Sequence, residues 1–101
     1  MTMSDANIAI IRNYFKDKPV LRAYLFGSYA RGDASVSSDI DILVELDYSE
    51  GIGLKYIQMQ LELPSLLNKE VDLVSELAVS RHVRPFIEKE KKLIYERPAK
   101  R

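Results

Sequence analysis

The sequence predicts an α/β (α+β) fold in which a small mixed β-sheet of about four strands is flanked by helices. Three observations indicate this class. Short segments alternate apolar with polar residues, longer segments carry apolar residues at helical spacing, and the two kinds of segment take turns along the chain. The 101 residues suit one domain, 1–101, built around a single hydrophobic core.

A helix and then a strand are predicted at the start of the chain. Apolar residues recur at helical spacing over about residues 4–16, and Ser4 or Asp5 can cap the beginning of this helix. Pro19 ends it, because proline has no backbone N–H to continue the hydrogen-bond ladder. Residues 20–26 then alternate as a strand. One face of that strand is expected to carry Leu21, Ala23 and Leu25.

A short turn, a loop and a second strand follow. Residues 28–31 can form about one helical turn, and Gly32 suits its end because glycine readily adopts the left-handed conformation. Residues 33–38 are small and polar, which is typical of a loop. Residues 39–46 form the clearest strand. Its alternation places on one face Ile40, Ile42 and Val44, and on the other Asp39, Asp41, Leu43 and Glu45.

The second half predicts two more helices and two more strands. A helix reaches about residue 67, and Pro64 inside it predicts a kink or a restart. A strand is expected over 70–74, a short helix over 85–91 and a last edge strand over 93–95. The apolar face of the longer helix is expected to be formed by Leu54, Ile57, Leu61 and Leu66.

Composition excludes several classes of protein and site. The formal net charge is zero, so bulk electrostatics give no reason to expect duplex DNA or an anionic membrane as a partner. No cysteine is present, which rules out disulfides and thiolate metal sites and favours a cytoplasmic location. We expect neither a signal peptide nor a membrane span. The basic tail, residues 97–101, is expected to be frayed.

The first candidate for chemistry is the pair Gly27 and Ser28, which ends a strand just before the helical turn. Glycine lets a ligand approach the backbone, and free N–H groups together with the serine hydroxyl can hold phosphate oxygens. Taken alone, this pair is more often only a turn. Arg31 in the same turn could add positive charge to bound phosphates, or it could simply be a surface guanidinium.

A second and third candidate are carboxylates on strands. Asp39 and Asp41 point to the same face because they are two residues apart on a strand. Two like charges at such a short separation repel each other, and a bound divalent cation such as Mg²⁺ removes the energetic cost of this repulsion. Asp72 occupies a polar position of the next predicted strand, and it could join the pair if the two strands are neighbours. The alternative for Asp39 and Asp41 is a pair of solvent-facing aspartates near a strand end, and the alternative for Asp72 is a strand-end aspartate that caps a turn.

These motifs together resemble the signature of the polymerase-beta-like nucleotidyltransferase superfamily. The string from Phe26 to Gly32, followed by the string from Ser38 to Val44, is similar to its minimal nucleotidyltransferase (MNT) group. Asp72 matches the place of that group's third carboxylate. The resemblance covers about residues 20–95 and departs from the group at Tyr29, where many relatives carry arginine.

The resemblance implies a site, a reaction and a partner. Asp39, Asp41 and Asp72 would hold Mg²⁺ in a two-metal site and carry catalysis, and Gly27 and Ser28 would bind the phosphates of ATP. Stand-alone MNT domains act as antitoxins beside a helical HEPN ribonuclease toxin and transfer AMP to a tyrosine of that toxin. The implied activity is therefore that of a protein adenylyltransferase in a hetero-oligomer with a HEPN protein.

The sequence is also compatible with two other functions. The domain could neutralise a toxin by binding alone, or it could transfer a nucleotide to a small molecule. The basic stretch 81–92 is more typical of a solvated face than of an RNA contact, and His82 within it is more typical of a surface residue than of a catalyst. The leucine-rich helix around residues 61–67 is a candidate for contact with a partner.

Overall fold

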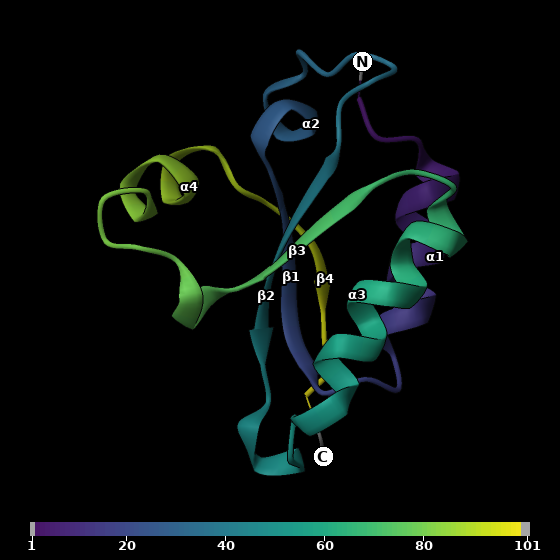
Figure 1. Cartoon of the computed structure of the whole chain (residues 1–101), viewed down its shortest axis with the longest axis vertical. Helices are drawn as coiled ribbons and strands as arrows, with labels where there is room; N and C mark the ends of the chain where they lie inside the picture. Colours follow the sequence, from purple (N-terminus) through teal and green to yellow (C-terminus); the bar gives the residue numbers. More distant parts are fainter. Residues whose placement is uncertain (1, 100–101) are drawn as a thin grey trace.

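The computed structural model describes residues 2–99 and confirms the alternation of helices and strands (Figure 1). Each strong periodic segment forms the expected element, with boundaries shifted by a residue or two. In order, the elements are α1 (Asp5–Phe15), β1 (Val20–Phe26), α2 (Gly27–Arg31), β2 (Ile40–Leu46), the 3₁₀ turn η1 (Tyr48–Glu50), α3 (Gly53–Leu67), β3 (Val71–Ser75), the 3₁₀ turn η2 (Glu76–Ala78), α4 (Arg84–Glu90) and β4 (Lys92–Glu96).

The four strands form one mixed sheet in the order β3-β2-β1-β4, which confirms the predicted fold class. β1 pairs antiparallel with both β2 and β4, and β2 pairs in parallel with β3. The parallel pair needs a long crossover, which α3 provides. β4 lies at one edge of the sheet, as expected.

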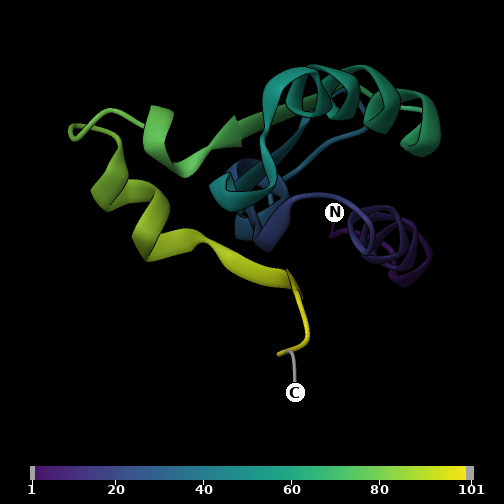
Figure 2. The same ribbon diagram turned by 90° about the horizontal axis from the view of Figure 1, so that it is seen from below.

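One face of the sheet is covered by α1 and α3, which lie side by side in both ribbon views (Figures 1 and 2). The serine cap of α1 is confirmed, because the Ser4 hydroxyl accepts a hydrogen bond from the Asn7 N–H at 3.1 Å. Apolar residues of this face and the two helices form the hydrophobic core. The fully buried side chains include Ile11 and Phe15 of α1, Met59 and Leu63 of α3, and Ile40, Ile42 and Val44 of β2.

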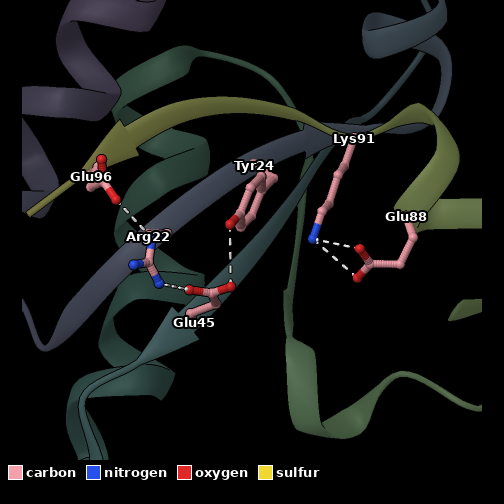
Figure 3. A network of polar contacts seen from close by, with 6 residues as sticks. All are labelled: Arg22, Tyr24, Glu45, Glu88, Lys91 and Glu96. Carbon is pink, nitrogen blue, oxygen red and sulfur yellow. Dashed lines mark hydrogen bonds and ion pairs between the residues drawn. The ribbon is translucent and has the colours of Figure 1, made fainter.

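The opposite face carries a network of charged and aromatic side chains (Figure 3). Arg22 of β1 forms ion pairs of 2.8 Å with Glu45 of β2 and with Glu96 of β4. The Tyr24 hydroxyl donates to Glu45 at 3.2 Å, and Lys91 lies over the Tyr24 ring with its Nζ 4.2 Å from the ring centroid. These contacts tie three neighbouring strands together on the face that also carries Asp41 of β2.

The residues whose spacing predicted α3 do not form its buried face. Leu54 and Leu61 are 80% and 70% exposed, and Ile57 and Leu66 are also exposed. The core side chains of α3 are instead Met59, Leu63 and Leu67. The helix runs without a restart through Pro64, which lies in its last turn. Among residues 2–99, no helix is long and apolar enough to cross a membrane.

Two further residues lie in unexpected surroundings. Leu21 is exposed rather than aligned with Ala23 and Leu25, because a register irregularity between Val20 and Arg22 in the pairing of β1 with β2 shifts the alternation. Arg97, expected in a frayed tail, donates from its guanidinium to Asp47 at 2.7 Å and to the Lys18 carbonyl at 2.9 Å. Positions 100–101 of that tail lie outside the described residues.

Substitutions of two leucines of α3 can test which face of this helix is buried. Leu63→Ala should lower the free energy of unfolding by about 3 kcal/mol, because it leaves a cavity in the core. Leu61→Ala should change it by less than about 0.5 kcal/mol, because that side chain is exposed. Urea unfolding followed by circular dichroism measures both values. Equal losses in the two variants would contradict the observed packing of α3.

Candidate active site

Gly27 follows the last residue of β1 and adopts a conformation that few other residues tolerate. Its φ is +71°, in the left-handed region that favours glycine. A Cβ built at this position would collide with the Asp41 carboxylate. The two residues come together because Phe26, just before Gly27, pairs with Asp41 in the β1–β2 register. Gly27 is therefore needed both for its backbone conformation and for the space that it leaves to Asp41.

The predicted turn after Gly27 is confirmed as the short helix α2. Gly32 ends it with φ +86°, and its N–H donates to the Ser28 carbonyl at 2.9 Å. The Asp33 N–H donates to the same carbonyl at 3.1 Å. Ser28 is half-buried, and within residues 2–99 its hydroxyl has no hydrogen-bond partner. This hydroxyl is thus able to bind a ligand at the end of β1.

The three predicted acids lie at one end of the sheet. Asp41 is in β2 and half-buried, Asp39 is exposed immediately before that strand, and Asp72 is exposed in β3. The parallel register pairs Asp41 directly with Asp72. The condition on which the role of Asp72 depended, that β2 and β3 be neighbours, is therefore met.

Asp41 shows the electrostatic result of this arrangement. Burial is the main cause, and together with the negative charges of Asp72 and Asp39 it raises the pKa of Asp41 to about 6. Arg31 acts in the opposite direction and lowers this pKa. At neutral pH the Asp41 carboxylate is thus ionised at a cost, beside other negative charges and partly out of water.

The donor chemistry of the three acids fits a hard divalent cation. Carboxylate oxygens are ligands that Mg²⁺ prefers, and a bound cation would relieve the repulsion that raises the pKa of Asp41. Within the part of the chain that the structure describes, no three acidic or histidine side chains stand close enough together to hold an ion as they are. Binding an ion with all three acids would therefore require side chains to turn toward one another.

Arg31 and Glu90 form a contact that sequence reasoning missed. Arg31, at the end of α2, pairs with Asp33 through Nε at 3.2 Å and with Glu90 of α4 through Nη1 at 3.2 Å. Glu90 also accepts a hydrogen bond from the Gly27 N–H at 3.1 Å. Glu90 is 63 residues from Gly27 in sequence and lies among alternating charges, so no local pattern distinguishes it.

The basic stretch 81–92 has partners within the chain. Arg84 donates to the Glu76 carbonyl at 2.9 Å, and Lys91 pairs with Glu88 at 2.9 Å. His82 is exposed in the turn before α4. The prediction that this stretch is mainly a solvated face agrees with these positions.

Tyr29, where the sequence departs from the pattern of minimal nucleotidyltransferases, is a core residue. It lies on α2, is 6% exposed and joins the main hydrophobic cluster. Its ring also faces Lys69, with 5.9 Å between Nζ and the ring centroid. The departure therefore affects packing beneath α2 and adds no polar group to the surface that carries Asp41.

The raised pKa of Asp41 predicts that the site destabilises the metal-free protein. A protein loses stability with rising pH when one of its acids has a higher pKa in the folded state than in the unfolded state. For Asp41 this loss occurs between its unfolded pKa, near 4, and its folded pKa, about 6. In EDTA, Asp41→Asn should therefore raise the free energy of unfolding at pH 7 by about 1 kcal/mol, after allowance for solvent screening. The gain should vanish at pH 4. Urea unfolding at both pH values measures it, and an equal gain at pH 4 would contradict the electrostatic cause.

Comparisons with known proteins identify a family that this chain resembles over most of its length. A family model described as "Polymerase beta, Nucleotidyltransferase" matches residues 9–100. Two relatives from Methanocaldococcus jannaschii are provisionally named protein adenylyltransferases. One is 40% identical over 88 residues, 85% of this chain and 83% of that protein. The other is 45% identical over 56 residues, 55% of this chain and 59% of that protein.

Two solved structures share the fold. One, described provisionally as a minimal nucleotidyltransferase, has a TM-score of 0.71 at 30% identity and covers 86% of this chain and 87% of its own. The other, a tri-AMPylated HEPN toxin in complex with an MNT antitoxin from Shewanella oneidensis, has a TM-score of 0.69 at 24% identity. The match covers 93% of this chain and 73% of that chain. The family model over residues 9–100, the relative that is 40% identical and the minimal nucleotidyltransferase structure show that the chain belongs to the polymerase beta nucleotidyltransferase family, as a minimal nucleotidyltransferase.

Proposed function

We propose that this nucleotidyltransferase transfers AMP from ATP, with Mg²⁺, to a hydroxyl group of a HEPN toxin and thereby acts as its antitoxin. The observation that carries the proposal is the position of Asp41, which lies against Gly27 and pairs across the sheet with Asp72. This position puts metal-binding oxygens beside backbone and hydroxyl groups that can bind phosphate.

The chemistry follows from the groups available at this end of the sheet. Asp39, Asp41 and Asp72 would hold Mg²⁺, which when bound supplies positive charge to the triphosphate. Ser28 and the Gly27 N–H would bind phosphate oxygens and orient the α-phosphorus. The acceptor oxygen bonds to that phosphorus, the bond to the β-phosphate oxygen breaks, and pyrophosphate leaves. Asp72 is exposed and is our candidate for the group that takes the acceptor proton.

A protein acceptor is supported by the relatives and by the open site. The Methanocaldococcus jannaschii relatives are provisionally named protein adenylyltransferases, and the Shewanella oneidensis structure contains an AMPylated HEPN toxin. In this chain, Asp39 and Asp72 are exposed at the end of the sheet, where a side chain of a second protein can approach them. A tyrosine hydroxyl is the acceptor that we propose.

The outer face of α3 is the surface that we propose for contact with the toxin. Leu54, Ile57 and Leu61 recur at spacings of three and four residues and are at least half exposed. A helix with apolar anchors at these spacings fits a groove between helices of an all-helical protein such as a HEPN toxin. Leu61 also lines a hollow shared with Tyr14 of α1, which extends the apolar surface toward that helix.

This apolar surface also favours a second function, in which the protein neutralises its toxin by binding alone. Binding through α3 would need neither nucleotide nor carboxylates, because α3 covers the face of the sheet opposite to Asp41. The two functions therefore make opposite predictions for variants of the acids.

Replacing the central acids tests catalysis. In Asp39→Ala combined with Asp41→Ala, transfer of labelled AMP from ATP to the co-purified toxin should fall by at least about a thousandfold, because the variant lacks the metal-binding oxygens. The toxin's ribonuclease activity should then persist in the presence of ATP. Transfer at the wild-type rate would contradict the proposed site. Full neutralisation by the variant without ATP would favour binding alone.

Replacing an exposed leucine of α3 tests the contact with the toxin. Leu61→Lys should weaken binding to the toxin by about tenfold or more, because a charge in the apolar interface must be desolvated. The variant's melting temperature should stay near that of the wild type, since Leu61 is 70% exposed. Isothermal titration of variant and wild type with the toxin measures the affinity. An unchanged affinity would place the contact elsewhere.

A further inference from the structure

We propose that the Glu90 carboxylate competes with the phosphates of the nucleotide for the Gly27 N–H and the Arg31 guanidinium, and so sets the affinity of the site for nucleotide. The inference rests on the proposed function, because it assumes that a triphosphate binds beside Gly27. It goes beyond that function in assigning a role to a residue of α4 that neither holds metal nor takes part in the transfer.

The contacts of Glu90 carry this inference. Its Oε1 accepts from the Gly27 N–H at 3.1 Å and from Arg31 Nη1 at 3.3 Å, and its Oε2 lies 3.2 Å from the same Nη1. The carboxylate thus binds the backbone donor at the end of β1 and the cation at the end of α2 at the same time. Its side chain is 24% exposed, so these contacts are only partly screened by water.

A carboxylate bound in this way uses the same donors that a phosphate would use. Both are oxyanions that accept hydrogen bonds from backbone N–H groups and from guanidinium groups. A phosphate oxygen that approaches Gly27 must therefore displace Glu90 or meet its negative charge, in addition to those of Asp39, Asp41 and Asp72. With Glu90 in place, the site carries four carboxylates, and its nearest cation is already paired.

The position of Glu90 in the fold explains how it can be displaced. It is the last residue of α4, and its bonds to Gly27 and Arg31 join that helix to α2. α4 lies apart from α1 and α3 (Figure 2), and Ile87 is the one buried residue among its seven. Releasing the Glu90 side chain would leave the packing of the core unchanged.

The competition can be measured by binding of nucleotide without any transfer. Isothermal titration with magnesium-AMP-PNP should show about three- to tenfold tighter binding for Glu90→Gln, which loses the charge but keeps an acceptor for Gly27. Glu90→Ala, which also frees the Gly27 N–H, should bind at least as tightly. Glu88→Gln is the matched control, because Glu88 lies on the same helix but pairs with Lys91, and it should bind like the wild type.

Each other outcome has a definite meaning. If both Glu90 variants bind AMP-PNP as weakly as the wild type, or more weakly with a lower melting temperature, Glu90 only supports α2 and the inference is wrong. In that case the proposed function stands as long as wild-type binding is lost in Asp39→Ala combined with Asp41→Ala. If the wild type and every variant fail to bind AMP-PNP, both the inference and the proposed function are overturned.

Discussion

The antiparallel register of β1 with β2 is the constraint on which the site depends. It sets Phe26 opposite Asp41, so that the chain turns at Gly27 directly beside the Asp41 carboxylate. The parallel register of β2 with β3 then places Asp72 next to Asp41. A shift of either register by one residue would turn the acids to the other face of the sheet. Such a shift is opposed by the hydrophobic core, because it would expose the buried side chains of Ile40, Ile42 and Val44.

The same arrangement concentrates negative charge at the end of the sheet. Burial and the neighbouring acids raise the pKa of Asp41, so the folded protein keeps an unfavourable ionised group in place. Such a group is useful in a site that binds a cation and a triphosphate, because the ligand removes the repulsion when it binds. In the free protein, Arg31 and Glu90 partly balance each other, one lowering and the other raising the pKa of Asp41.

The two faces of the sheet have separate tasks. α1 and α3 bury one face, and this packing provides the hydrophobic stabilisation of the fold. The other face carries ion pairs and the Tyr24 ring (Figure 3), and Asp41 of β2 lies on this face as well. The outward side of α3 adds an exposed apolar surface away from the acids. A partner protein bound to this surface of α3 would leave the acids accessible, so that an acceptor residue of the partner could reach them.

The sequence by itself determined the elements, the class of the sheet and the positions of Asp41 in β2 and Asp72 in β3. These follow from local spacing, because the alternation of apolar and polar residues defines the strands. The prediction that Asp39 shares a face with Asp41 assumed a strand from residue 39, whereas β2 begins at Ile40. The resemblance to minimal nucleotidyltransferases identified the same residues. Only the tertiary structure decided which side of α3 is buried, because apolar residues occur on both sides and packing against the sheet selects Met59 and Leu63. It also decided the irregularity at Leu21 and the contact of Glu90 with Gly27, because pairing between distant segments creates both.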